Sequence, residues 1–343
     1  MAPRNRGNAL PENQETAILV TGAAGYIGSV LCEELIDNGY RVIALDNLEQ
    51  GHQPALPPDV TFILADLADG EALDRVFAAY PVEAVMHLAA YSLVSESVAQ
   101  PARYFKNNVV NGINLLDAML AHGVKKMVFS SSAAVYGEPV SLPIREQDPE
   151  RPTNPYGESK LMFEKTLQWY NRAYGLKFIS LRYFNAAGAS RRFGEDHHPE
   201  THLIPNLMKV ALKQEEHLYV YGTDYDTEDG SCIRDYIHVV DIARAHILAL
   251  RALERVRARI YNLGNGEGYS VLQVVKAARE ITGAEVPVLL QPRRPGDPAR
   301  LVASPELIRS ELDWQPRYPD LKDIIASAWK WHREHPHGYS KEG

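Results

Sequence analysis

Six short apolar runs in the first half of the chain constrain its fold more than any other feature. Each run is nearly continuous in apolar residues, which is typical of strands buried on both faces of a parallel sheet. The runs are AILVTG (17–22), RVIALDN (41–47), VTFILAD (60–66), AVMHLAA (84–90), KKMVFSSS (125–132) and KFISLRYFN (177–185). Amphipathic segments lie between them, such as 26–38 before Gly39 and 103–122 before Gly123. This alternation predicts an α/β fold with a doubly wound parallel sheet, the Rossmann architecture.

The second half of the chain loses this alternation after about residue 186. Residues 188–233 are rich in His, Pro, Asp, Gly and Tyr, and contain one clear helical pattern at 203–214. The segment 234–253 begins as a strand and becomes a helix, and 260–266 has the pattern of a further strand. For 270–343 we expect two more helices. These patterns predict a smaller, irregular α/β substrate domain.

The domain boundaries follow from this change of pattern. We predict a dinucleotide-binding domain at 15–187 and a substrate domain at 188–343, with roughly 234–266 packing back on the first domain. Residues 1–14 are polar and rich in Pro and Asn, so we expect a disordered extension there.

Composition excludes some classes of partner. The net charge of −8 and the isoelectric point near 5.9 argue against a nucleic-acid or anionic membrane partner. The chain has two cysteines, Cys32 and Cys232, whose spacing fits neither a disulfide framework nor a metal site, and we predict no metal. Apolar runs are too short to span a membrane or to form a signal peptide. We therefore expect a cytoplasmic protein.

A glycine-rich segment marks a nucleotide-binding loop. Gly22, Gly25 and Gly28 lie between the first strand and the first helix, where glycine allows a pyrophosphate to approach the backbone at a helix N-terminus. Asp46 ends the second strand and is placed to accept hydrogen bonds from ribose hydroxyls. No Arg or Lys follows closely to bind a 2′-phosphate, so NAD is favoured over NADP. Asp66 is expected to flank the adenine, or alternatively to cap a helix.

A Ser, a Tyr and a Lys indicate chemistry at an alcohol carbon. Ser132 ends the fifth apolar run, and Tyr156 and Lys160 lie one helical turn apart, so they share a face. A nearby ammonium and the positive cofactor ring are expected to lower the pKa of Tyr156, which then acts as a base. A second Tyr-x-x-x-Lys copy, Tyr318 to Lys322, contains Pro319 and follows no serine-rich strand. We interpret that copy as accidental.

Several longer segments carry a resemblance to a known family. They are LVTGAAGYIGS, LDN, HLAAYSLVSESV, NNV, FSSSAAVYG, NPYGESK, LRYFNAAGA, EDGSCIRDYIHVVD, YNLGNG and PRRPGDPARLVA. On these segments the chain resembles the extended short-chain dehydrogenase/reductase family from Ile18 onward, and within it the UDP-hexose 4-epimerases. The resemblance implies tightly held NAD and interconversion of UDP-galactose and UDP-glucose. The implied route is oxidation at C4, rotation of the 4-keto sugar and re-reduction.

The resemblance also implies the site residues. Those expected to line NAD are Gly22, Gly25, Tyr26, Ile27, Gly28, Asp46, Asn47, Asp66, Leu67, Leu88, Ala89, Ala90, Ser92, Asn107, Ser130, Tyr156, Lys160, Tyr183 and Phe184. Those expected to bind the UDP-hexose are Ser132, Tyr156, Asn185, His202, Leu203, Tyr219, Val220, Tyr221, Arg234, Arg294, Asp297 and Leu301. Ser132, Tyr156 and Lys160 form the catalytic group. Arg294 taken alone is equally compatible with a solvated surface residue.

Three departures and substitutions bear on the activity. Ser92 stands where some members of the family carry a Lys that contacts the cofactor, and His202 stands where others have an Asn near the sugar nucleotide. Neither change removes a catalytic group, so any effect is expected on the affinity for these ligands. Related 4,6-dehydratases place an Asp-Glu pair after the strand Ser or Thr, where this chain has Ala133 and Ala134. That difference favours epimerisation over elimination of water.

Other functions stay open at this stage. They are a UDP-N-acetylglucosamine 4-epimerase, a net NAD-dependent oxidoreductase of a sugar nucleotide, and a nucleotide-binding protein on a degenerate scaffold. Leu301 stands where epimerases restricted to glucose and galactose can carry Tyr, which leaves room for N-acetyl sugars. The helices at 103–122 and 156–175 match those that pair across the dimer in the family, so we expect a homodimer.

Overall fold

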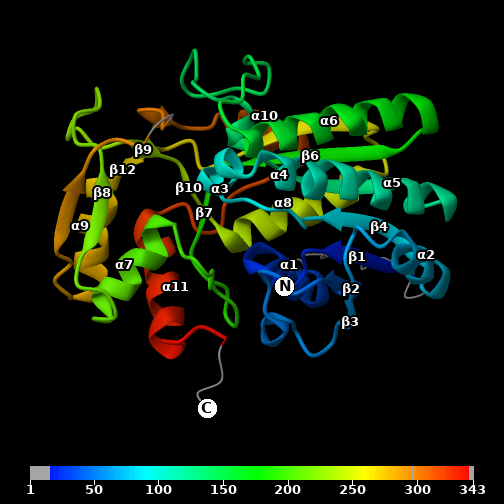
Figure 1. The fold of residues 1–343 in the computed structure, drawn as a ribbon, viewed down its shortest axis with the longest axis horizontal. Coiled ribbons are helices and arrows are strands. Elements are labelled where there is room, and N and C mark those ends of the chain that lie inside the picture. The colour runs from blue at the N-terminus through cyan, green and yellow to red at the C-terminus, as the bar shows by residue number, and fades with distance from the viewer. Residues whose placement is uncertain (1–15, 295–296, 340–343) are drawn as a thin grey trace, which may run out of the picture.

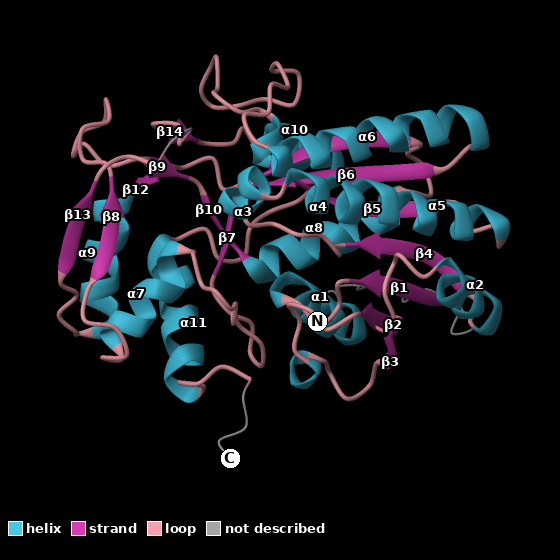
Figure 2. Cartoon of the chain, in the orientation of Figure 1, coloured by secondary structure: helices cyan, strands magenta, loops and turns pink. Residues whose placement is uncertain are grey.

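A seven-stranded parallel sheet forms the centre of the larger part of the molecule (Figures 1 and 2). The computed structural model describes residues 16–294 and 297–339, so the predicted extension at 1–14 lies outside the described residues. The strand order is β11-β6-β5-β4-β1-β2-β3. The strands are β1 (Ala17–Thr21), β2 (Arg41–Asp46), β3 (Thr61–Leu64), β4 (Val82–His87), β5 (Lys126–Ser132), β6 (Lys177–Tyr183) and β11 (Ala258–Leu263). The doubly wound α/β fold is confirmed.

Helices cover both faces of this sheet and bury two separate cores. One face carries α1 (Tyr26–Asp37), α8 (Val239–Ala252) and the short α10 (Glu306–Leu312). The other face carries α2 (Gly70–Ala79), α5 (Asn111–Ala121) and α6 (Pro155–Tyr174). Because both faces are covered, the strands need apolar side chains on both sides, which explains their continuous apolar runs. Cys32, on α1, is buried within the first core as part of its apolar face.

The segment expected as one helix at 103–122 contains a π-helical turn. It consists of α4 (Pro101–Phe105), the π turn η2 (Lys106–Val110) and α5. A π turn inserts one extra residue into a helix, and such turns are frequent at functional sites. Within it, Asn108 is buried and its amide donates to Ser159 Oγ on α6 (2.9 Å). The π turn therefore ties this helix to the helix that carries Tyr156 and Lys160.

The smaller part of the molecule has its own core. Helices α7 (Leu203–Ala211), α9 (Val271–Thr282) and α11 (Leu321–Glu334) pack with strands β8 (Leu218–Tyr221) and β13 (Val288–Gln291), which pair in parallel. Short strands connect the two parts: β7 (Asn185–Ala187) pairs with β10 (Tyr236–His238), and β9 (Ile233–Arg234) lies between β12 (Tyr269–Ser270) and β14 (Arg300–Leu301). The remaining short helices are η1 (Gln53–Ala55), α3 (Val94–Ala99) and η3 (Ala133–Val135).

The expectation of two helices in 270–343 was wrong. The described part of this segment has three, α9, α10 and α11. The additional helix, α10, is seven residues long, too short to show a helical periodicity in the sequence. The structure also places β11 beside β6 in the main sheet and α8 against α1. The division of the chain at residue 187 stays a prediction. None of the helices in the described residues is long and apolar enough to cross a membrane.

Candidate active site

The serine, tyrosine and lysine meet where β5 ends and α6 begins. Ser132 is the last residue of β5, and Asn154 caps α6 by accepting from the Gly157 N–H (2.9 Å). Asn at the N-cap and Pro155 at the first helical position are the expected start signals of a helix. The helix therefore begins directly before Tyr156, which fixes where its ring lies relative to the strand end.

Lys160 is held by the backbone of the same strand. Its Nζ donates to the carbonyl oxygen of Ser130 (2.8 Å) and lies 5.9 Å from the centre of the Tyr156 ring. The side chain is 4 % exposed, and burial lowers its pKa from 10.5 to about 7, although the Glu164 carboxylate opposes that shift. Lys160 can therefore exchange a proton near neutral pH.

Burial raises the pKa of Tyr156 above its usual value of 10, and a hydrogen bond with Ser132 only partly offsets that effect. Burial dominates because desolvation penalises the phenolate. The predicted lowering depends on the ammonium and the positive cofactor ring together, so it stays a prediction for the protein with cofactor bound.

A buried polar chain behind Lys160 escaped the sequence analysis. Ser130 Oγ is hydrogen-bonded to the Tyr183 hydroxyl, which lies 2.7 Å from His246 Nε2. His246 lies on α8 and is fully buried, and its Nδ1 contacts the Ile242 carbonyl (2.9 Å). Ser130 and Tyr183 were predicted to line the cofactor, whereas His246 lies in an amphipathic helix pattern without any signal of its own. This chain fixes the strand whose carbonyl holds Lys160.

The glycine loop fits a dinucleotide. A Cβ on Gly28 would lie 2.1 Å from the Gly22 carbonyl oxygen, and one on Gly22, whose φ is +70°, would lie 2.6 Å from the Ala89 nitrogen. Both positions therefore require glycine, and they draw the loop tightly against the end of β4. Among the described residues, no side chain caps α1 at Gly25, and the first turn of this helix has no acidic residue. That helix end is suited to an anionic pyrophosphate.

Acidic side chains follow β2 and β3 at the same edge. Asp46 is buried and accepts from the backbone N–H groups of Ala24 (2.9 Å) and Leu48 (2.8 Å), while burial raises its pKa above 3.8. Asn47 donates to Asp66 (2.8 Å). The alternative role of Asp66 as a helix cap was wrong, because Asp69 caps α2. Asp46, Asn47 and Asp66 thus lie together at the end of β2, and a hydrogen bond joins Asn47 to Asp66.

The other residues predicted for the cofactor lie in several environments. Leu88, Ala89 and Ala90 follow β4, which ends earlier than expected, at His87, and Ser92 is exposed. Asn107 lies in the π turn, Leu67 and Phe184 are buried, and Ile27 lies in the first turn of α1. Tyr26 is buried and donates its hydroxyl proton to the Gly188 carbonyl (2.6 Å). The Tyr26 side chain therefore links the start of α1 to the segment that follows β7.

Residues predicted for the UDP group gather around β9 and β8. Arg234 on β9 forms an ion pair with Asp297 and donates to the Ile233 carbonyl (2.7 Å). The exposed Arg294 guanidinium stacks over Tyr221, 4.1 Å from the ring centre. Arg294 is therefore an exposed cation beside an aromatic ring.

The remaining predicted substrate residues fall in three places. On β8, Tyr219 is 47 % exposed but the Val220 side chain is buried in the core of the smaller part, because side chains alternate along a strand. Asn185 starts β7 and Leu203 starts α7. Leu301 lies in β14, where it pairs with Arg234 of β9, and it packs on a cluster that includes Ala133 and Phe184.

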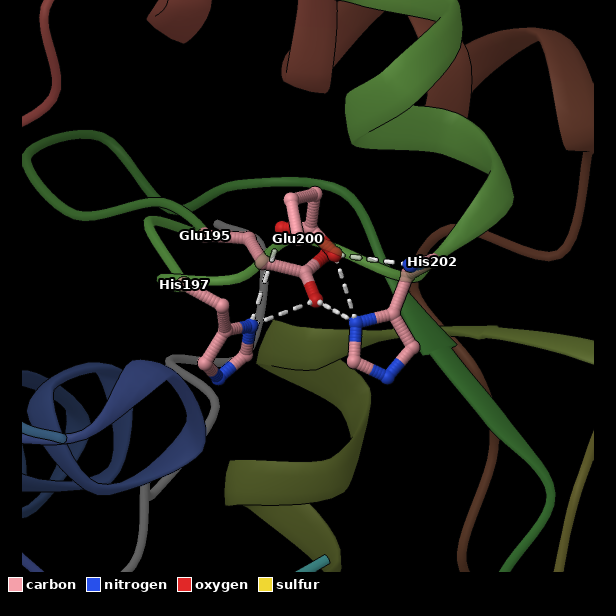
Figure 3. Close-up of side chains that lie close together, drawn as sticks. All are labelled: Glu195, His197, Glu200 and His202. Atoms are coloured by element: carbon pink, nitrogen blue, oxygen red, sulfur yellow. Dashed lines mark hydrogen bonds and ion pairs between the residues drawn. The ribbon is translucent and has the colours of Figure 1, made fainter. Parts of the chain in front are cut away.

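His202 is engaged differently from the prediction. It precedes α7, but its imidazole is paired with Glu195 (2.8 Å) and Glu200 (2.9 Å). Figure 3 shows both Nδ1 atoms, of His197 and of His202, turned toward these carboxylates. The structure thus brings His202 into a His–Glu cluster.

The fold and the glycine loop define a dinucleotide-dependent enzyme of the Rossmann type, for which Ser132, Tyr156 and Lys160 are the predicted catalytic group. The model of the NAD dependent epimerase/dehydratase family matches residues 18–264, and the chain belongs to this family. A UDP-glucose 4-epimerase of Halalkalibacterium halodurans is 54% identical over 329 residues, which cover 95% of this chain and 98% of that protein.

Solved structures agree with this assignment. A crystal structure of a UDP-glucose 4-epimerase superposes with a TM-score of 0.93 at 48% identity, covering 95% of this chain and 100% of the other. The UDP-glucose 4-epimerase of Bifidobacterium longum, solved in complex with NAD+ and UDP, gives 0.90 at 40% identity, covering 94% and 100%. The predicted family, fold and NAD dependence are thereby confirmed.

Proposed function

We propose that the protein interconverts UDP-galactose and UDP-glucose with NAD, as a UDP-glucose 4-epimerase. One observation carries this proposal: Ser132, Tyr156 and Lys160 lie together where β5 ends and α6 begins, at the same edge of the parallel sheet as the glycine loop, while the residues after Ser132 are Ala133 and Ala134. Alcohol oxidation has its acid–base group, and elimination of water lacks the carboxylic acids that it needs. The identity to UDP-glucose 4-epimerases supports the substrate.

The catalytic residues have separable roles. NAD, when bound, supplies reversible oxidation of an alcohol carbon. Tyr156 holds and returns the proton of the C4 hydroxyl, and Ser132, hydrogen-bonded to it, orients that hydroxyl. Lys160, whose ammonium is held by the Ser130 carbonyl, stabilises the phenolate through its positive charge. The same group serves both directions, so the reaction has no net redox change.

The UDP part is held at the opposite end of the site. We propose that a diphosphate takes the place of Asp297 at the Arg234 guanidinium and contacts Arg294, because guanidinium groups form charge-assisted bonds with phosphate oxygens. Asp297, once released, can accept from a ribose diol. Anchoring by the nucleotide leaves the sugar free to present either face to the cofactor.

A single incubation distinguishes this activity from its alternatives. Purified protein is given UDP-galactose, first without and then with added NAD, while UDP-glucose and the absorbance of NADH are followed. We expect UDP-glucose to form without accumulation of NADH. Stoichiometric NADH would instead identify a net oxidoreductase, and silence in both channels would contradict the choice of substrate.

Leu301 supports a wider sugar range. It is partly buried and packs on the cluster formed by Ala133, Tyr136 and Phe184, so it lies near the end of β5. We predict that Leu301→Tyr lowers kcat/KM for UDP-N-acetylglucosamine by roughly tenfold or more and changes that for UDP-galactose less than about threefold, since the larger ring fills the space for the acetamide. Leu289→Tyr, at an exposed position on β13, is the control. Failure of the wild type to convert any N-acetyl sugar would contradict this proposal.

An exposed apolar face supports a homodimer. Met162 and Trp169, seven residues apart on α6, are 40% and 65% exposed, and Val98 on the adjoining α3 is 63% exposed. We propose that this face pairs with that of a second chain, because burying these exposed apolar side chains against one another would stabilise a dimer.

The dimer is tested by charge insertion. We expect Met162→Glu to convert a dimer into a monomer at micromolar concentration, measured by light scattering after size exclusion, because it buries an unpaired carboxylate. Leu290→Glu, a 60% exposed site on β13, should leave the mass unchanged. A dimer that survives the first substitution would place the interface elsewhere.

A further inference from the structure

Four ligand-type side chains converge in the segment before α7. Glu195, His197, Glu200 and His202 follow one another as Glu-x-His-x-x-Glu-x-His, and each offers one atom within 4.8 Å of the others. Figure 3 shows the two imidazoles on either side of the carboxylates, with the interactions running between them. The carboxylate side chains are 5% and 2% exposed, whereas the histidines reach solvent at 24% and 44%. The cluster is thus buried on its acidic side and accessible on its imidazole side.

The distances within the cluster fit a tetrahedral metal. Zn²⁺ binds His nitrogen and carboxylate oxygen at about 2.0–2.2 Å, which separates the ligand atoms of a tetrahedron by roughly 3.3–3.6 Å. Here His202 Nδ1 lies 2.8 Å from Glu195 Oε1 and 2.9 Å from Glu200 Oε1. His197 Nδ1 lies 3.1 Å from Glu195 Oε1 and 3.7 Å from Glu200 Oε2. These four nitrogen–oxygen distances lie within about 0.5 Å of the tetrahedral separations, and one atom from each residue lies within 4.8 Å of the others.

The charge of the cluster requires two positive charges. Two buried carboxylates are stable only if they are compensated. In the structure, the His197 and His202 imidazoles lie against these two carboxylates. One divalent cation bound by two neutral imidazoles would cancel the charge of both carboxylates.

We propose that Glu195, His197, Glu200 and His202 form a Zn²⁺-binding site. Two imidazoles and two carboxylates form a donor set that suits Zn²⁺. This departs from our sequence-based prediction of no metal, which considered the cysteines and overlooked the spacing of 195–202.

The position of the site gives the metal a structural role. The ring of Tyr26, the first residue of α1 after the glycine loop, meets the His197 ring edge-on, with the ring centres 6.3 Å apart. His202 directly precedes Leu203, the first residue of α7. A bound metal would hold the 195–202 segment against both the glycine loop and the start of α7. The inference concerns binding and stability, and it does not depend on the identity of the sugar.

A neighbouring cluster supplies a matched control. His52, Asp196 and His198 also lie within 4.8 Å of one another, but they offer only three ligand atoms. Two of its members, Asp196 and His198, alternate along the chain with Glu195 and His197 of the proposed site. A histidine removed from each cluster therefore tests which of them binds.

The first experiment measures zinc binding directly. Full-length protein is stripped with a chelator, dialysed against Zn²⁺ and compared with His197→Gln and His52→Gln, with circular dichroism to confirm folding. We expect one tight Zn²⁺ per chain, a loss of affinity of roughly 100-fold in His197→Gln, and a change of less than about twofold in His52→Gln. Equal affinity in all three proteins, or loss in His52→Gln alone, would overturn the proposal.

A second experiment needs no variant. Calorimetric titration of the chelator-stripped wild type with Zn²⁺ gives the stoichiometry and the dissociation constant directly. We expect one saturable site per chain, because the four side chains offer one ligand atom each. The absence of saturable binding would show that the four residues form only an ion-pair network. Epimerase assays on the same samples are recorded separately, so either proposal can fail alone.

Discussion

Replacing Tyr156 with Phe is expected to lower kcat for epimerisation about 10³-fold, the size of effect that loss of a positioned acid–base group produces. The substitution removes only the hydroxyl, so α6 and the cofactor loop should stay as they are. Retention of NAD and of UDP affinity should therefore be near normal. The measurement is the rate of UDP-glucose formation at saturating UDP-galactose, together with binding of NAD and UDP.

Tyr318→Phe is the matched control for this change. Tyr318 belongs to the second Tyr-x-x-x-Lys copy, and its ring stacks on His238 at 4.2 Å, a contact that Phe preserves. Its partner Lys322 lies beyond the α11 cap Asp320 and pairs with Glu280 (2.9 Å). We expect this variant to keep wild-type activity. Near-normal turnover by Tyr156→Phe would instead refute the catalytic assignment.

Replacing Lys160 with Met is expected to lower kcat about 10²- to 10³-fold and yet to stabilise the cofactor-free protein. The activity falls because the phenolate of Tyr156 loses its cation. The stability rises by about 1–3 kcal/mol at pH 6, because Lys160 is buried and an apolar side chain avoids the desolvation of its charge. Denaturant unfolding of both proteins without NAD measures this difference, with Lys322→Met as the exposed control.

The pH dependence of that difference has a definite sign. The pKa of Lys160 is about 7 in the folded protein and 10.5 as a free side chain, so between these values the unfolded state binds more protons. The stability that Lys160 contributes therefore rises with pH in that window, whereas below pH 7 the full cost of burying the ammonium is present. The advantage of Lys160→Met should shrink between pH 7 and pH 10. A constant difference would mean that Lys160 stays charged.

Much of the fold could be predicted because its signals are local. Continuous apolar runs predicted six strands of the parallel sheet, and Gly39 and Gly123 correctly marked helix ends. The short α10 and the π turn at 106–110 were missed, since seven residues carry little periodicity and a π turn has no sequence pattern. The sequence-based prediction missed these two elements because it cannot detect a helix as short as α10 or the hydrogen-bond geometry of a π turn.

The residues that can carry the chemistry were determined by the sequence itself. The glycine loop, Ser132, Tyr156 and Lys160 were recognisable because their spacing places them at a strand end and on one helical face. Their electrostatic state was decided only by the tertiary structure. Burial raised the pKa of Tyr156 and lowered that of Lys160, since desolvation depends on what packs around a group. The pairing of Arg234 with Asp297 and the convergence of His202 with two buried carboxylates likewise arise from folding, which brings charges together at distances no linear pattern states.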